Sequence, residues 1–324
     1  MKKYFEFIRE SKIAEAEMFI NHNITNPADV EPDGSITVHS DLYLTHLSFE
    51  RLPVTFNAVY GDFNISSTGL KTLSGCPQYV HGNFYCSDNE LTDLRGGPRE
   101  VKGEYDCKHN KLTSLEGGPF SVGWVFDASV NDITSLEGMS KSTIKKQFIM
   151  TNNALTNLKG CPVSFDYYFD HNEINTLDGF PYEKIDGTFD VSFNNLTDLR
   201  GGPIEVKGYF DIEMNQLTTL KGSPERIMGG FDFGHNDLWS FDGWPALCNT
   251  DDDVSWRMTP VHSITALFGH DPRCIEPLNE WEPIDVENRS VSYLRLSEVF
   301  TDLGMEVPEF EEIRKNLRYY KLTD

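Results

Sequence analysis

A unit of about 21 residues recurs through most of the chain, and this repeat limits the possible folds more than any other feature. The segments GNFYCSDNELTDLRGGP, GEYDCKHNKLTSLEGGP, GTFDVSFNNLTDLRGGP and GYFDIEMNQLTTLKGSP are versions of one phrase. A leucine or isoleucine marks each unit, at Leu70, Leu91, Leu112, Ile133, Leu155, Ile174, Leu196, Leu217 and Leu238. A fixed period of this length is typical of a solenoid, in which each unit packs mainly against its neighbours.

Each unit predicts one short strand followed by an irregular return. Aromatic and small apolar residues alternate with polar ones, as in Phe84/Cys86 and Phe189/Val191, and a period of two is typical of a half-buried strand. The return is about a dozen residues and often contains Gly-Gly-Pro, as at Gly96–Pro98. Such a segment cannot form a regular helix, so we expect an extended or 3₁₀ return.

An asparagine follows the strand in most units, and its amide can bond the backbone of the turn and of the neighbouring coil. The predicted buried ladder consists of Asn89, Asn110, Asn131, Asn153, Asn172, Asn194, Asn215 and Asn236. Apolar residues before an asparagine and a leucine two positions after it resemble the leucine-rich-repeat pattern. The resemblance implies a curved parallel β-sheet with an irregular or 3₁₀ convex side, although aromatic residues here replace the usual strand leucines.

The repeat predicts three regions. Residues 34–249 form the solenoid, with about nine or ten coils of 21 residues. Residues 1–33 form an N-terminal helical cap, with Phe5, Ile8 and Phe19 on its apolar face. Residues 250–324 form a helical C-terminal cap or small domain, because solenoids need polar end caps and the period stops there.

A closer resemblance rests on Gly-Cys-Pro at Gly75–Pro77 and Gly160–Pro162, and on the phrases TPVHSITALFGHDPRCIEPLNEWEPI and LRLSEVFTDLGMEVP. Over roughly residues 60–310 the chain resembles leucine-rich-repeat proteins of large T4-like tailed bacteriophages. The resemblance implies a cytoplasmic protein of an infected bacterium, aimed at a host or defence protein, without an assigned biochemistry.

The charge and the cysteine pattern argue against several classes of protein. The chain has 28 basic and 51 acidic residues, a net charge of −23, which disfavours direct binding of nucleic acid or anionic membranes. The N-terminal segment carries charges such as Glu6 and Arg9, and no run of 18 apolar residues occurs, so we expect neither a signal peptide nor a membrane span. Six cysteines without a CxxC pair predict free thiols and no metal or other cofactor.

The outward strand positions form the candidate binding surface, because their neighbours on the same strand point into the core. Acids and tyrosines dominate these positions, and stacked carboxylates repel one another. The predicted partner-binding residues of the concave face are Glu104, Asp106, Asp127, Asp166, Tyr168, Asp170, Asp190, Tyr209, Asp211, Glu213 and Asp232. A solvated sheet that merely favours charge, or a divalent-cation site between the aspartate rows, would also explain the acids.

Other polar groups have a structural and a functional interpretation. The segment KSTIKKQ at residues 141–147 is a bulged convex turn or a basic contact site. His109, His171 and His235 fit turn hydrogen bonding better than metal binding. Asp251, Asp252 and Asp253 fit a polar linker or helix cap, and His262, His270 and Cys274 lack the accompanying motifs of a catalytic or metal site.

The favoured hypothesis is a non-enzymatic scaffold whose acidic concave face binds a basic host or defence protein, with inhibition of that protein as one consequence. One alternative is a substrate-selecting repeat domain of an enzyme with a small catalytic C-terminal region, as in bacterial effector ubiquitin ligases. The other is a structural, virion-associated protein. The oligomeric state and the identity of the partner do not follow from the residues.

Overall fold

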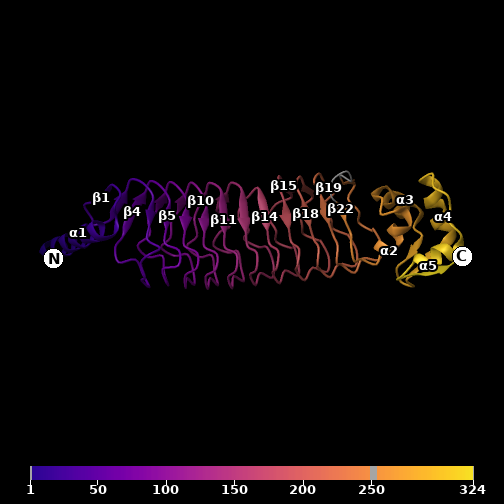
Figure 1. Ribbon diagram of the computed structural model, residues 1–324, viewed down its shortest axis with the longest axis horizontal. Coiled ribbons are helices and arrows are strands. Elements are labelled where there is room, and N and C mark those ends of the chain that lie inside the picture. Colours follow the sequence, from indigo (N-terminus) through magenta and orange to yellow (C-terminus); the bar gives the residue numbers. More distant parts are fainter. Residues whose placement is uncertain (1, 249–253, 324) are drawn as a thin grey trace. The chain divides into compact units, whose positions relative to one another are not determined.

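A computed structural model of the chain describes residues 2–248 and 254–323 (Figure 1), with side chains described from Glu6 onward. Asp251, Asp252 and Asp253 therefore lie outside the described residues, as does the side chain of Phe5. The chain divides into two compact units, Met1–Glu173 and Ile174–Asp324. The boundary between the units falls inside the predicted repeat region, and each unit is described by itself.

Most coils of the first unit have two short strands, which run parallel to the equivalent strands of the neighbouring coils. The aromatic strands, which carry the buried ring or its equivalent, are β3 (Leu42–Tyr43), β5 (Phe63–Asn64), β7 (Phe84–Tyr85), β9 (Tyr105–Asp106), β11 (Val125–Asp127), β13 (Gln147–Ile149) and β14 (Asp166–Tyr168). The valine strands, which carry a buried valine or isoleucine, are β4 (Phe56–Val59), β6 (Tyr79–Val80), β8 (Glu100–Val101), β10 (Ser121–Val122) and β12 (Thr143–Ile144).

The prediction of one strand per unit was therefore wrong. Strands β6, β8, β10 and β12 each contribute a single buried side chain, such as Val101, which is 1% exposed. One apolar residue is too short a pattern to show a period of two. What makes this segment a strand is its pairing with the next coil, for example Glu100 and Val101 with Ser121 and Val122.

The core consists of the repeat leucines and a stack of rings. Phe84 and Phe126, on strands β7 and β11, lie on either side of Tyr105, with ring centroids 4.9 and 5.3 Å away, and all three are fully buried. Aromatic rings can replace leucine here because each ring contacts the equivalent ring of the next coil. The coil returns contain turns and bends. Among the described residues, 3₁₀ helix occurs only in the C-terminal region, at η1 (Ala266–Phe268) and η2 (Pro272–Cys274).

The N-terminal region combines a helix with an antiparallel strand pair. Helix α1 (Lys2–Asn23) precedes β1 (Ala28–Val30), which pairs with β2 (Ile36–Val38), and β2 pairs in parallel with β4. Only the later turns of the helix are covered: Phe19 is buried and lies 6.1 Å from the Phe56 ring, whereas Ile8 is 37% exposed. The prediction that Ile8 lies on a buried face was therefore wrong, because the first coil covers only the C-terminal half of the helix.

The second unit repeats the two-strand coil. Its aromatic strands are β16 (Phe189–Asp190), β18 (Phe210–Asp211), β20 (Phe231–Asp232) and β22 (Val254–Ser255), and its valine strands are β15 (Lys184–Ile185), β17 (Glu205–Val206), β19 (Arg226–Ile227) and β21 (Leu247–Cys248). The coil geometry continues past the expected end at residue 249. Strand β22 pairs with β20, and the Trp256 ring stacks on Phe233 at 6.1 Å. Thr259, at the asparagine position, donates to the Trp256 carbonyl at 2.7 Å.

The remaining residues of this unit form short helices and a small sheet (Figure 1). The helices are α2 (His262–Thr265), α3 (Ile275–Trp281), α4 (Tyr293–Asp302) and α5 (Phe310–Asn316), and the sheet consists of β23 (Ile284–Asp285), β24 (Ser290–Ser292) and β25 (Lys321–Thr323). The segment NEWEPIDVE, which was expected to be helical, leaves the helix after Trp281, because Pro283 cannot continue it. The Tyr320 hydroxyl donates to the Trp239 carbonyl at 2.7 Å, which ties this region to the last coils.

Candidate functional site

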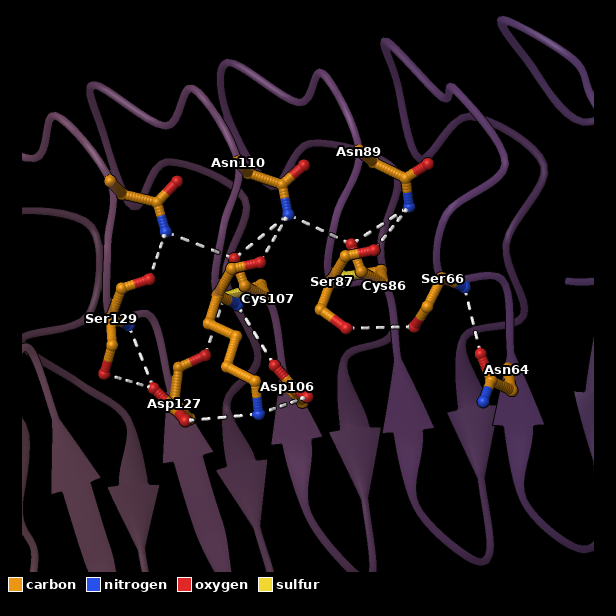
Figure 2. Close-up of polar contacts among 12 residues, drawn as sticks. Asn64, Ser66, Cys86, Ser87, Asn89, Asp106, Cys107, Asn110, Asp127 and Ser129 are labelled. Carbon is orange, nitrogen blue, oxygen red and sulfur yellow. Dashed lines mark hydrogen bonds and ion pairs between the residues drawn. The ribbon is translucent and has the colours of Figure 1, made fainter.

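The asparagine ladder holds neighbouring coils together (Figure 2). The Asn110 amide nitrogen donates to the carbonyl of Cys107 in its own coil at 3.1 Å and to that of Cys86 in the preceding coil at 3.0 Å. Its amide oxygen accepts the Leu91 N–H at 3.1 Å. The same arrangement recurs at Asn89, Asn131, Asn153, Asn172, Asn215 and Asn236, and Asn194 accepts the N–H of Ile174 in the same way. Backbone groups at each turn are thereby satisfied inside the stack.

The aromatic-strand face is the outward surface of the aromatic strands. Its central column, the position directly after the buried ring, has aspartate at five positions, and each of these carboxylates also caps a turn. Asp127 Oδ1 accepts the N–H of Ser129 at 2.9 Å and its hydroxyl at 2.5 Å, below the asparagine ladder (Figure 2). Asp106, Asp190, Asp211 and Asp232 accept the N–H two residues ahead in the same way, and so does the amide oxygen of Asn64. The aspartates therefore stabilise the end of each strand, whatever else they contact.

In the second unit this column consists of carboxylates on three neighbouring strands. Asp211 lies in register with Asp190 on one side and with Asp232 on the other. Burial, together with the charges of Asp190, Asp232 and Glu213, raises the pKa of Asp211 to about 7, despite the stabilising Glu213 N–H. The Asp211 carboxylate is thus largely protonated below neutral pH and becomes charged as the pH rises through about 7.

The equivalent column of the first unit includes a cation. Asp106 is 5% exposed, and Lys108 Nζ lies 3.1 Å from its Oδ2 and 3.9 Å from Asp127 Oδ2. Burial nevertheless raises the pKa of Asp106, and burial together with the Asp106 charge raises that of Glu104. Lys108 therefore partly neutralises this acidic region of the first unit.

The other predicted residues flank the central columns on the same face of their own unit. Asp170 accepts the Thr151 hydroxyl at 2.6 Å and lies 2.9 Å from His171 Nδ1. The Gln147 amide nitrogen lies 3.4 Å from both Asp166 Oδ2 and the Tyr168 hydroxyl. Tyr209 and Glu213 are half-buried on the second unit. Thus Glu104, Asp106, Asp127, Asp166, Tyr168 and Asp170 line the face in the first unit, and Asp190, Tyr209, Asp211, Glu213 and Asp232 line it in the second.

Sequence reasoning missed a left-handed backbone position directly before each ladder asparagine. Its residues have φ values of 51–58°, although none is glycine. The position is occupied by Ser67, Asp88, His109, Val130, Asn152, His171, Phe193, Met214 and His235, and by Met258 before Thr259. The three histidines singled out from the sequence belong to this column. A positive φ costs free energy for a residue with a Cβ, but no residue type in the repeat signals it.

The geometry gives little support for a metal site or for a catalytic nucleophile. In residues 2–248 and 254–323, no group of three or more His, Cys, Asp or Glu side chains is arranged to hold a metal ion. The His262 and His270 rings stack at 4.2 Å, and burial, with the His270 charge, lowers the pKa of His262. Burial also raises the pKa of Cys274 to about 12, which disfavours the nucleophilic thiolate. None of the described helices is long and apolar enough to cross a membrane.

Stacked two-strand coils with buried leucines and an asparagine ladder define a leucine-rich-repeat solenoid. A solved structure of YopM from Yersinia enterocolitica WA-314 is similar to the chain, with 18% sequence identity and a TM-score of 0.36. The similarity covers 68% of this chain and 65% of the YopM chain, slightly less than two thirds of the latter. No protein family and no curated protein matches the sequence. These comparisons do not support the resemblance to bacteriophage proteins, and the fold class follows from the coil geometry itself.

Proposed function

We propose that this protein is a binding scaffold that holds a basic protein partner on the aromatic-strand face. Solenoids of stacked repeats generally serve as protein-interaction surfaces, since stacking presents one row of outward side chains per coil. The observation that carries the proposal is the column Asp190, Asp211 and Asp232, in register on neighbouring strands with Glu213 beside it. A cationic partner would relieve the repulsion that raises the pKa of Asp211.

Turn capping alone does not explain the acidic column. Asn64 caps the equivalent turn with an uncharged amide oxygen at 2.9 Å, so a neutral residue can serve the structural role. Three charged residues in register give up some stability that asparagine would retain. A role of these three carboxylates in binding a partner accounts for the stability that is given up. The proposed setting, a host or defence protein in the cytoplasm of an infected bacterium, rests on the sequence resemblance alone.

The test removes charge without removing the turn caps. The double variant Asp190→Asn/Asp211→Asn keeps an acceptor oxygen at both turns, and Glu183→Gln/Glu225→Gln is the matched control, because both glutamates are exposed on the same unit outside the column. Proteins captured from bacterial lysate by the wild type are compared with those captured by each variant, using quantitative mass spectrometry. We expect a basic protein that the wild type and the control retain and the aspartate variant loses.

Association kinetics then test the mechanism with the captured protein in purified form. Surface-plasmon association should slow markedly as salt shortens the screening length from about 10 Å at 0.1 M to about 3 Å at 1 M. Tyr209→Ala should mainly speed dissociation, because a desolvated aromatic contact acts after docking. Equal capture by all three proteins, or association that is indifferent to salt, would show that the aromatic-strand face is not the binding surface.

A further inference from the structure

The corner between the valine strand and the aromatic strand is a glycine position in most coils. Gly61, Gly82 and Gly103 occupy it in the first unit, and a Cβ on Gly103 would lie 2.1 Å from Asn83 Oδ1. In the second unit, a Cβ on Gly208 or on Gly229 would lie 2.5 Å from the backbone of the preceding coil. The repeat therefore favours glycine here for a steric reason.

Three successive coils of the first unit break this rule, with Trp124, Lys146 and Phe165. The Trp124 N–H donates to the Gly103 carbonyl at 3.1 Å, the Lys146 N–H to the Trp124 carbonyl at 3.1 Å, and the Phe165 N–H to the Lys146 carbonyl at 3.2 Å. These residues thus continue the same backbone ladder, at a strand spacing of about 4.8 Å. Their side chains form a ring, cation, ring column, in which Trp124 is 63% exposed and Phe165 41% exposed.

Further cations and a ring lie in these coils and in the coil before them. Arg99 Cζ lies 4.9 Å from the centroid of the Phe120 ring, which is 57% exposed, and Lys146 Nζ lies 5.4 Å from that of Phe165. Lys145 precedes Lys146 and is also exposed. Strands β8, β10 and β12, which pair in register, hold these residues in neighbouring coils. We call Arg99, Phe120, Trp124, Lys145, Lys146 and Phe165 the basic–aromatic patch.

The cations of the patch differ from Lys71 and Lys111 of the same unit, which have carboxylate partners. Lys71 and Lys111 lie 2.6 and 3.3 Å from Glu50 and Glu90, respectively. In the described part of the chain, by contrast, no carboxylate oxygen lies within 4.0 Å of the charged groups of Arg99, Lys145 or Lys146. In a chain with a net charge of −23, unpaired cations beside exposed rings leave both charge and apolar area available to a ligand.

We propose that the basic–aromatic patch binds an acidic segment of a partner protein, in which carboxylates and apolar side chains alternate along one face of an extended strand, that is, at every second residue. The ring, cation, ring order of Trp124, Lys146 and Phe165 complements an apolar, acidic, apolar order in an extended peptide. Single-stranded nucleic acid fits less well. Cations already lie over the Phe120 and Phe165 rings, where bases would stack, and a long polyanion is repelled by the net charge more strongly than a short segment. This inference uses none of the acidic columns and is independent of the function proposed above.

A peptide array tests the patch with defined probes. Immobilised peptides of about eight residues place Leu, Val or Phe on either side of Glu, Gln or Lys along one face of the extended chain, with serine at the intervening positions. An oligothymidylate of about 20 nucleotides is a separate probe. We expect the full-length protein to prefer the Glu peptides. Lys145→Glu/Lys146→Glu should lower this binding by about tenfold or more, whereas the charge-matched control Lys71→Glu/Lys111→Glu should change it by less than about twofold.

A second variant separates loss of binding from loss of the folded structure. Trp124→Gly restores the residue type of the other coils, so its circular dichroism spectrum and unfolding temperature should stay close to those of the wild type, while Glu-peptide binding falls by about tenfold. The proposal is overturned by equal binding of Glu and Gln peptides, or by equal losses in both charge-reversal variants. Preference for the oligothymidylate would assign the patch to nucleic acid. A dimer in sedimentation that Lys145→Glu/Lys146→Glu abolishes would assign it to a second copy of the chain.

Discussion

At the scale of single residues, the asparagine ladder and the aspartate caps differ in how much they contribute to the free energy of unfolding. Asn110→Ala should lower the free energy of unfolding by about 1–3 kcal/mol, because it leaves backbone groups of two coils unsatisfied. Asp127 accepts two hydrogen bonds from Ser129, so Asp127→Ala should lower the free energy of unfolding by about 1 kcal/mol. Asp127→Asn should restore most of that loss. Urea unfolding measures all three, and a large loss for Asp127→Asn would contradict the capping role.

The left-handed column provides a second test at this scale. Val130 has φ 55° and is 40% exposed, and Asn152 has the same φ at the equivalent position of the next coil. A β-branched residue is strained there, whereas asparagine tolerates the conformation. Val130→Asn should therefore raise the free energy of unfolding by about 1 kcal/mol, and Asn152→Val should lower it by a similar amount. Calorimetry of the two variants checks the prediction, and shifts of the same sign would refute it.

At the scale of elements, strands β16, β18 and β20 place three carboxylates in register, which makes stability depend on pH. The folded-state pKa of Asp211 is about 7, against an ordinary value of 3.8. Between these values the folded state binds more protons than the unfolded state, so the Asp211 contribution to stability falls as pH rises from about 4 to 7. Asp211→Asn should remove this decline and stabilise the protein above pH 7 by about 1–2 kcal/mol, because partial exposure screens the shift.

Denaturant unfolding at several pH values from 4 to 8 measures this effect. Asp237→Asn is a matched control, since Asp237 is an exposed carboxylate in the same unit. Its pH profile should follow that of the wild type. If Asp211→Asn and the wild type lose stability in parallel between pH 4 and 7, the Asp211 carboxylate is not the group responsible.

At the scale of the whole molecule, the C-terminal region closes the apolar end of the last coil. Removal of residues after 249 takes away strand β22 and Trp256, which cover β20 and Phe233. We expect the 1–249 fragment to keep its β circular dichroism signal but to aggregate, because an apolar cross-section then meets water. Light scattering and circular dichroism test this together. A soluble 1–249 fragment that unfolds cooperatively would mean that the C-terminal region is a separate domain.

The sequence by itself was sufficient for the repeat unit and for which of its residues point inward or outward. The period, the buried leucines, the ladder asparagines and the outward acids all follow from a short pattern that is repeated many times, so each copy reinforces the others. The alternation of Phe189 and Val191 with polar neighbours placed Asp190 on the outer face, where the structure has it. The segment NEWEPIDVE has no such repetition, and only its first residues, up to Trp281, are helical.

The features that depend on atoms of a neighbouring coil could be determined only from the tertiary structure. Val101 forms a strand because it pairs with Val122 of the next coil. The pKa of Asp211 is raised by burial and by the charges of Asp190 and Asp232. Trp124 takes the place of a glycine in the repeat, and its N–H bond to Gly103 shows this. A local pattern shows which way a side chain points but not what the neighbouring coil places against it. The acids could therefore be assigned to one face from the sequence, whereas their second role as turn caps and the basic–aromatic patch required the stacked coils.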